Sequence, residues 1–163
     1  MKAVLPALAR PLVEPQLPAG LDVHWFTSSE EALALVVDAD IGWLDNNNPR
    51  EWARVVAAGA GLKWLSTIYA GLDALDTGLL RERGTRVTNG SGVNAHTVAE
   101  YAVMGALVAA KRFDQVVRAA DRHEWPTDAP GKLELFESRA LVIGYGTIGR
   151  LIGERLEAFG VEV

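Results

Sequence analysis

The sequence contains no cysteine among its 163 residues, so disulfide bonds and thiolate chemistry are excluded. A chain without cysteine fits a reducing compartment, and we expect a cytoplasmic protein. Basic residues are not in excess either, since the formal net charge is -5. This balance argues against nucleic acid as a main partner, because a phosphate backbone requires a basic surface.

Long hydrophobic runs are also absent. The most apolar stretch, residues 98–110, is shorter than a membrane span and contains Glu100. The apolar run at the N-terminus is interrupted by Pro6, Arg10 and Pro11, which disfavours a secretory signal. Histidine and the acidic residues do not cluster with the spacing of metal ligands. We therefore expect a soluble chain with no membrane partner and no metal site.

The first 90 residues alternate short apolar segments with helical patterns. Ser28 and Glu31 have the spacing of a capping box, Pro49 suits a first helical position, and Asp76 suits a cap. Strands separated by helices of this length predict a parallel sheet with crossover connections. The predicted strands are residues 3–5, 21–26, 40–44, 62–68 and 86–88, and the predicted helices are residues 28–37, 49–58 and 76–83.

One long helix is predicted from Asn94 to about Asp121. Its first half is apolar on nearly every face, as in helices that are buried all round. Such a helix packs between domains or subunits, or it forms the centre of one core, and the pattern leaves both open. A loop rich in proline and glycine follows at residues 125–138. We expect a domain boundary in this region, dividing the chain into residues 1–93 and 94–163.

A glycine pattern, G-x-G-x-x-G, is formed by Gly144, Gly146 and Gly149. It lies between an apolar segment at residues 139–143, predicted as a buried strand, and a predicted helix at residues 148–159; residues 161–163 begin another strand. Gly144 permits a tight turn, Gly146 lets a pyrophosphate approach the backbone, and Gly149 lets the helix pack closely. The pattern predicts a dinucleotide site; a glycine-rich turn without a ligand is the alternative.

Three backbone N–H groups of this loop, those of Tyr145, Thr147 and Ile148, are predicted to bind the phosphates together with the helix dipole. The acidic residue that binds the adenosine ribose is expected ~20 residues further along the chain. That position falls at or beyond Val163. The predicted cofactor is therefore NAD or NADP, with no choice between them.

Three segments carry a family resemblance: STIYAGLDAL at residues 66–75, VTNGSGVNAHTVAEYAVMGALVAAKR at residues 87–112, and VIGYGTIG at residues 142–149. In this order they resemble the N-terminal half of the D-isomer-specific 2-hydroxyacid dehydrogenase family. The resemblance implies an α/β architecture, in which a flavodoxin-like parallel-sheet substrate domain is followed by the first βαβ of a Rossmann domain. It also implies a homodimer through the helix at residues 94–120.

The resemblance implies reversible hydride transfer between a nicotinamide and a small 2-oxo or 2-hydroxy acid. Tyr69, Ala70 and Gly71 match the loop whose backbone N–H groups bind the substrate carboxylate, although an ordinary turn is the alternative. Asn94 matches a substrate contact of the formate dehydrogenase branch, and it also suits a helix N-cap. Thr97, on the same helix start, is expected to face the nicotinamide.

No catalytic residue is expected within these residues, because the arginine, carboxylate and histidine of the family come later in the chain. His96 is disfavoured as a base for that reason. We expect an incomplete N-terminal portion of a dehydrogenase, inactive by itself. The alternatives are a non-catalytic dinucleotide-binding module similar to the co-repressor branch of the family, or an inert truncated product that self-associates through residues 98–112.

Overall fold

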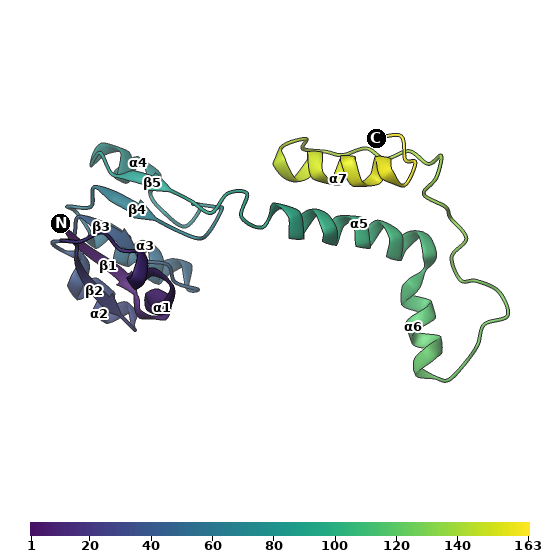
Figure 1. Ribbon diagram of the computed structural model, residues 1–163, viewed down its shortest axis with the longest axis horizontal. Helices are drawn as coiled ribbons and strands as arrows, with labels where there is room; N and C mark the ends of the chain where they lie inside the picture. The colour runs from purple at the N-terminus through teal and green to yellow at the C-terminus, as the bar shows by residue number, and fades with distance from the viewer. The chain divides into compact units, whose positions relative to one another are not determined.

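The computed structural model describes residues 1–163. The chain forms two compact units, Met1–Ser91 and Gly92–Val163, whose elements are labelled in Figure 1. No helix of the structure combines the length and the apolarity needed to cross a membrane.

The first unit is built on a five-stranded sheet with the order β2-β1-β3-β4-β5. All neighbouring strands are parallel. This order is that of flavodoxin-like folds, in which ligands bind beyond the carboxyl ends of the strands. The predicted parallel α/β sheet is confirmed. The strands are β1 (Lys2–Pro6), β2 (Asp22–Phe26), β3 (Ile41–Trp43), β4 (Trp64–Ser66) and β5 (Arg86–Thr88).

Three helices of this unit begin where the sequence predicts. The side chains of Ser28, Asn48 and Asp76 each accept a backbone N–H group of the first helical turn. Such caps satisfy donors that have no partner inside the helix. The predicted helix starts are therefore confirmed. The helices are α2 (Ser29–Val36), α3 (Pro49–Ala58) and α4 (Thr77–Glu82).

The connection between β1 and β2 contains short helical turns that the sequence analysis missed. They are η1 (Ala7–Ala9), α1 (Arg10–Val13) and η2 (Glu14–Gln16). Pro11 and Pro15 lie in the first turns of α1 and η2, where a missing N–H group costs nothing. Helical turns of three or four residues are too short to show helical periodicity in the sequence. For this reason the sequence analysis did not find them.

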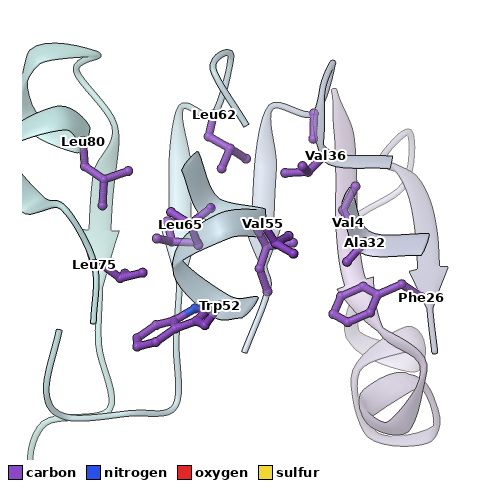
Figure 2. Close-up of a cluster of buried hydrophobic side chains, with 13 residues drawn as sticks. Val4, Phe26, Ala32, Val36, Trp52, Val55, Leu62, Leu65, Leu75 and Leu80 are labelled. Atoms are coloured by element: carbon purple, nitrogen blue, oxygen red, sulfur yellow. The ribbon is translucent and has the colours of Figure 1, made fainter. Parts of the chain in front are cut away.

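The hydrophobic core of the first unit lies between its helices and the sheet. Trp52, Val55 and Val56 of α3 are buried, with the spacing that places them on one helix face. Figure 2 shows Trp52 and Val55 beside Leu65 of β4, which is fully buried. Burial of each such side chain contributes about 1.5–3 kcal/mol. This packing fixes α3, and the loop before it, next to the carboxyl ends of β3 and β4.

The opposite, amino-terminal end of β3 carries the carboxylate of Asp40. Lys63 Nζ lies 2.6 Å from its Oδ1, and the backbone N–H of Lys2 donates to Oδ2 at 2.9 Å. The hydrogen bond from Lys63 and then that from Lys2 hold the pKa of Asp40 below its ordinary value. A carboxyl group whose pKa is lowered on folding stabilises the fold above its unfolded pKa, and this contribution is lost as the pH falls through the lowered value.

We expect Asp40→Asn to weaken the acid sensitivity of the protein. Asparagine still accepts a hydrogen bond, but it has no proton to bind below about pH 4. Urea unfolding at a series of pH values measures the effect: the stability of the wild type should fall more steeply below pH ~4 than that of the variant. Equal slopes for the two proteins would show that Asp40 does not couple protonation to folding.

The second unit contains three helices, α5 (Ala95–Lys111), α6 (Phe113–Asp121) and α7 (Thr147–Ala158). Helices α5 and α7 lie side by side (Figure 1) and form the main helix–helix packing of this unit. Val103 of α5, Leu156 of α7 and Val161 form its buried cluster. Helix α7 and the glycine loop before it agree with the prediction.

The prediction of one continuous helix from Asn94 to about Asp121 was wrong. The helix is interrupted at Arg112, whose φ of 49° is left-handed. The loop at residues 125–138 packs directly against this break. The contact is so close that a Cβ on Gly131 would lie 2.1 Å from the carbonyl carbon of Lys111. The interruption comes with a contact from far along the chain, so local periodicity gave no sign of it.

The buried strand predicted at residues 139–143 was also wrong. Only one isolated bridge forms there, between Arg139 and Glu162. The strand predicted at residues 161–163 consists of this same bridge and nothing more. Leu141 and Ile143 are 87% and 92% exposed. A buried parallel strand needs paired neighbours and covered faces. The apolar composition is that of such a strand, but Leu141 and Ile143 stay uncovered and only Ala140 and Val142 are partly buried.

Candidate functional site

The loop that follows β4 carries Tyr69, Ala70 and Gly71. The carbonyl groups of Tyr69 and Ala70 each accept a hydrogen bond from the loop that follows β5. The N–H of Gly90 donates to Tyr69 O at 3.0 Å, and Asn89 Nδ2 donates to Ala70 O at 2.8 Å. The two loops are in close contact, since a Cβ on Gly90 would lie 2.0 Å from the carbonyl oxygen of Ile68. The carbonyl groups are thus turned into the protein.

The backbone N–H groups of Ala70 and Gly71, in contrast, donate to no acceptor in the chain. The two preceding N–H groups are bonded: that of Ile68 to Asp45 Oδ2 at 2.8 Å, and that of Tyr69 to Thr67 Oγ1 at 3.1 Å. Successive unpaired N–H groups form a binding site for an anion. They lie beyond the carboxyl end of a parallel strand, which is the ligand-binding edge of such sheets.

A cavity of about 590 Å³ adjoins this loop. The ring of Tyr69 packs edge-on against Trp52, with centroids 5.2 Å apart, and its hydroxyl donates to Asn47 Oδ1 at 3.1 Å. Two aromatic rings thus form one wall of the cavity, whose surface is largely apolar with a few polar groups. The cavity is lined by Asn46, Asn47, Pro49, Trp52, Tyr69, Gly71, Asp73 and Ala74.

Several residues of this cavity, Trp52 among them, were missed by the sequence analysis. Asn46 and Asn47 come one residue after the strand predicted at residues 40–44, and polar residues at the carboxyl end of a strand were the available signal. Asp73 belongs to the motif at residues 66–75, but the sequence analysis predicted no role for it. Its Oδ2 lies 2.7 Å from the place of a Cβ on Gly71, so its negative charge stands beside the anion site.

The glycine loop before α7 shows a separate reason for each glycine. Gly144 has a φ of +94°, which favours glycine. A Cβ on Gly149 would lie 2.1 Å from the carbonyl oxygen of Gly144, so only glycine permits this approach of helix and loop. A Cβ on Gly146 would meet no atom within 4 Å. Nothing inside the chain therefore demands a glycine at position 146, and a ligand outside it would.

The start of α7 also presents free donors. No side chain caps this helix, and the N–H groups of Thr147 and Ile148 have no acceptor in the chain. The ring of Tyr145 lies over α7, where its hydroxyl oxygen comes within 2.7 Å of the place of a Cβ on Gly153. The loop is thus held against the helix, and its free N–H groups and open space fit a pyrophosphate.

The start of α5 contains the remaining predicted residues, Asn94 and Thr97. Asn94 occupies the N-cap position, but its side chain makes no capping hydrogen bond. Thr97 is exposed in the first turn. Their neighbour His96 has its Nδ1 3.3 Å from Arg155 Nη2, and Arg155 Nη1 donates to Leu151 O at 2.8 Å. His96 is therefore attached to α7, a contact that the sequence did not predict.

Comparison with known families gives one match over nearly the whole chain. Residues 4–154 match the model of the D-isomer specific 2-hydroxyacid dehydrogenase, catalytic domain. The D-3-phosphoglycerate dehydrogenase of Mycobacterium bovis is 30% identical over 145 residues, which cover 88% of this chain and 27% of that protein. The chain therefore spans roughly a quarter of the length of this relative.

Solved structures share the fold. A D-isomer specific 2-hydroxyacid dehydrogenase family protein from Aeromonas salmonicida superposes with a TM-score of 0.82 and 22% identity, covering 98% of this chain and 51% of that one. The NAD-dependent formate dehydrogenase from Staphylococcus aureus, solved in complex with NAD, gives 0.69 and 22%, covering 99% and 54%. The mixed α/β fold expected from the resemblance is confirmed.

Proposed function

We propose, from the premise that this chain belongs to the D-isomer-specific 2-hydroxyacid dehydrogenase family, that it forms part of an NAD(P)-dependent oxidoreductase. The proposed reaction interconverts a D-2-hydroxy acid and its 2-oxo acid by hydride transfer. The observation that carries the proposal is the pair of unpaired N–H groups at Ala70 and Gly71, at the ligand-binding edge of the sheet. We assign residues 1–93 to the substrate domain and residues 94–163 to the start of the dinucleotide-binding domain.

The substrate carboxylate, in this proposal, accepts hydrogen bonds from the N–H groups of Ala70 and Gly71. Hydrogen bonds to a charged group contribute about 1.5–3 kcal/mol each. Tyr69 shields the carboxylate from water, and its ring is fixed by Trp52 and Asn47. The rest of a small acid then extends toward the aromatic wall of the cavity.

The cofactor is NAD or NADP, which supplies a nicotinamide that gives or takes a hydride. Residues 144–149 would hold its pyrophosphate: Gly146 leaves space for it, and the N–H groups of Tyr145, Thr147 and Ile148 donate to it. The presence of NAD in the staphylococcal structure agrees with this assignment. Thr97 would face the nicotinamide.

The proton of the reaction has no obvious carrier among these residues. Hydride transfer to a 2-oxo acid needs a group that protonates the carbonyl oxygen and a cation that polarises it. His96 is attached to Arg155 and lies in none of the motifs that the family uses for this step. We therefore propose that the isolated chain binds but does not catalyse.

A homodimer is the proposed assembly. Helices α5 and α6 expose several large apolar side chains, as interfaces between subunits do before assembly. The exposed apolar residues of these two helices are Val98, Tyr101, Met104, Phe113, Val116 and Val117.

The cytoplasm is the proposed location.

Asn94→Ala should separate a substrate contact from a helix cap. Because the side chain of Asn94 makes no capping hydrogen bond, its loss should leave the melting temperature nearly unchanged. If Asn94 contacts the acid, the KM of the complete protein for the 2-oxo acid should rise by about tenfold, as expected for one lost hydrogen bond of about 1.4 kcal/mol. A lowered melting temperature with an unchanged KM would favour the cap.

Amide NMR of the 163-residue chain tests the proposal directly. Pyruvate should shift the N–H resonances of Ala70 and Gly71, and NADH should shift those of Thr147 and Ile148. The N–H groups of Ile68 and Tyr69 provide an internal control, since both already donate within the protein. Pyruvate shifts spread over the surface without a maximum at the loop after β4 would argue against the substrate site.

A further inference from the structure

We propose that Asp45 is a positioning residue for substrate binding: it fixes the peptide between Thr67 and Ile68, at the start of the loop, so that the N–H groups of Ala70 and Gly71 point at the ligand. The inference rests on the proposed function, because it takes the loop after β4 as the carboxylate site. Asp45 itself does not touch the substrate in this proposal.

The carboxylate of Asp45 joins the carboxyl ends of two neighbouring strands. Its Oδ2 accepts from Trp43 Nε1 at 2.7 Å, which holds the side chain against its own strand, β3. The same oxygen accepts from the backbone N–H of Ile68 at 2.8 Å, which belongs to the loop after β4. Hydrogen bonds to an ionised acceptor are shorter and stronger than those between neutral groups. Asp45 is therefore a firm link between the two strand ends.

The other oxygen of Asp45 makes the link costly for folding. Oδ1 is buried and has no hydrogen-bond partner in the chain. A buried polar atom without a partner destabilises a protein, and an apolar residue would avoid this cost. Real proteins accept such costs at functional or strained sites. The link to Ile68 gives the carboxylate a reason to be there.

The loop is anchored at its start and at the two peptides that carry its free N–H groups. Asp45 holds it at the N–H of Ile68, whereas Asn89 and Gly90 hold it at the carbonyl groups of Ala70 and Tyr69. Without the first anchor, the N–H of Ile68 loses its acceptor, and the start of the loop can shift although the N–H of Tyr69 still donates to Thr67 Oγ1. A binding site held in its bound geometry loses less freedom when the ligand arrives. Loss of Asp45 should therefore weaken binding of the acid, with every direct donor still present.

The test compares three variants of the 163-residue chain, Asp45→Leu, Asp45→Asn and Asp40→Leu. Asparagine keeps one oxygen that accepts from both Trp43 and Ile68, and leucine keeps none. Asp40 is the matched control, because it also binds a backbone N–H beside β3, but at the opposite end of the strand. The readouts are the Kd for pyruvate, from the amide shifts of Ala70 and Gly71, and the melting temperature.

We expect Asp45→Leu to raise the Kd for pyruvate by about tenfold, the factor that corresponds to ~1.4 kcal/mol. Asp45→Asn should restore the Kd to within about threefold of the wild type. Asp40→Leu should lower the melting temperature and leave the Kd unchanged. If Asp45→Leu does not fold, Trp43→Phe removes the second donor to the same oxygen and should raise the Kd by about threefold.

An unchanged Kd in a folded Asp45→Leu or Trp43→Phe protein would overturn the inference and leave the substrate site standing. Equal Kd values for the Asp45→Leu and Asp40→Leu variants would overturn it as well, because both residues would then act on stability alone. A wild-type chain whose Ala70 and Gly71 resonances do not respond to pyruvate would instead refute the proposed function, and the inference with it.

Discussion

Gly146→Val is expected to lower the affinity for NADH by about a hundredfold and to leave the fold intact. The backbone at Gly146 has a φ of -81°, which other residues adopt, and an added Cβ meets nothing within 4 Å. The valine therefore fits the protein and occupies the space assigned to the pyrophosphate. Loss of one or two charged hydrogen bonds, about 2.7 kcal/mol, corresponds to this factor.

The matched control is Gly105→Val in α5, in the same unit. Its added Cβ also meets nothing within 4 Å, and valine in a helix is no worse than glycine. Circular dichroism should show both variants folded, and titration with NADH should show a loss of affinity in the Gly146 variant alone. Wild-type affinity in Gly146→Val would mean that the loop does not hold a pyrophosphate.

Gly90→Ala is expected to disrupt the substrate loop from the other side. An added Cβ would lie 2.0 Å from the carbonyl oxygen of Ile68 and 2.7 Å from its carbonyl carbon, and both are backbone atoms that cannot turn away. The loops after β4 and β5 must separate, and the hydrogen bond from Gly90 to Tyr69 O is lost. Forced overpacking costs about 1–3 kcal/mol. The Kd for pyruvate should rise by more than about tenfold.

Gly61→Ala serves as its control, because there the added Cβ makes only an ordinary contact, 3.6 Å from the carbonyl oxygen of Ala39. Thermal unfolding and pyruvate titration should leave this variant close to the wild type. A Gly90→Ala protein with the stability and the Kd of the wild type would show that the two loops are not packed as described.

Local chemistry explains what the sequence could predict. Helix starts depend on a cap and the next few residues, so Ser28 and Asp76 identified α2 and α4. The glycine loop is equally local, because the turn at Gly144 and the close approach at Gly149 are encoded within six residues. The loop of Tyr69, Ala70 and Gly71 was found by its resemblance to a family motif, and its unpaired N–H groups became visible only in the structure.

Contacts between distant segments explain what the sequence could not predict. The interruption at Arg112 meets Gly131, and the exposure of Leu141 and Ile143 depends on which segments cover them. The link from Asp45 to Ile68 exists because β3 and β4 are neighbours in the sheet. Periodicity along one segment carries no information about such neighbours.

The most direct test of the central claim is transfer of a labelled hydride by the oxidoreductase of which this chain is proposed to form part. NADH or NADPH carrying deuterium at nicotinamide C4 is incubated with the protein and a panel of 2-oxo acids, and the products are analysed by mass spectrometry and chiral chromatography. The account predicts a D-2-hydroxy acid with deuterium at C2. Binding of the nucleotide without any labelled product would contradict it and would favour a non-catalytic dinucleotide-binding module.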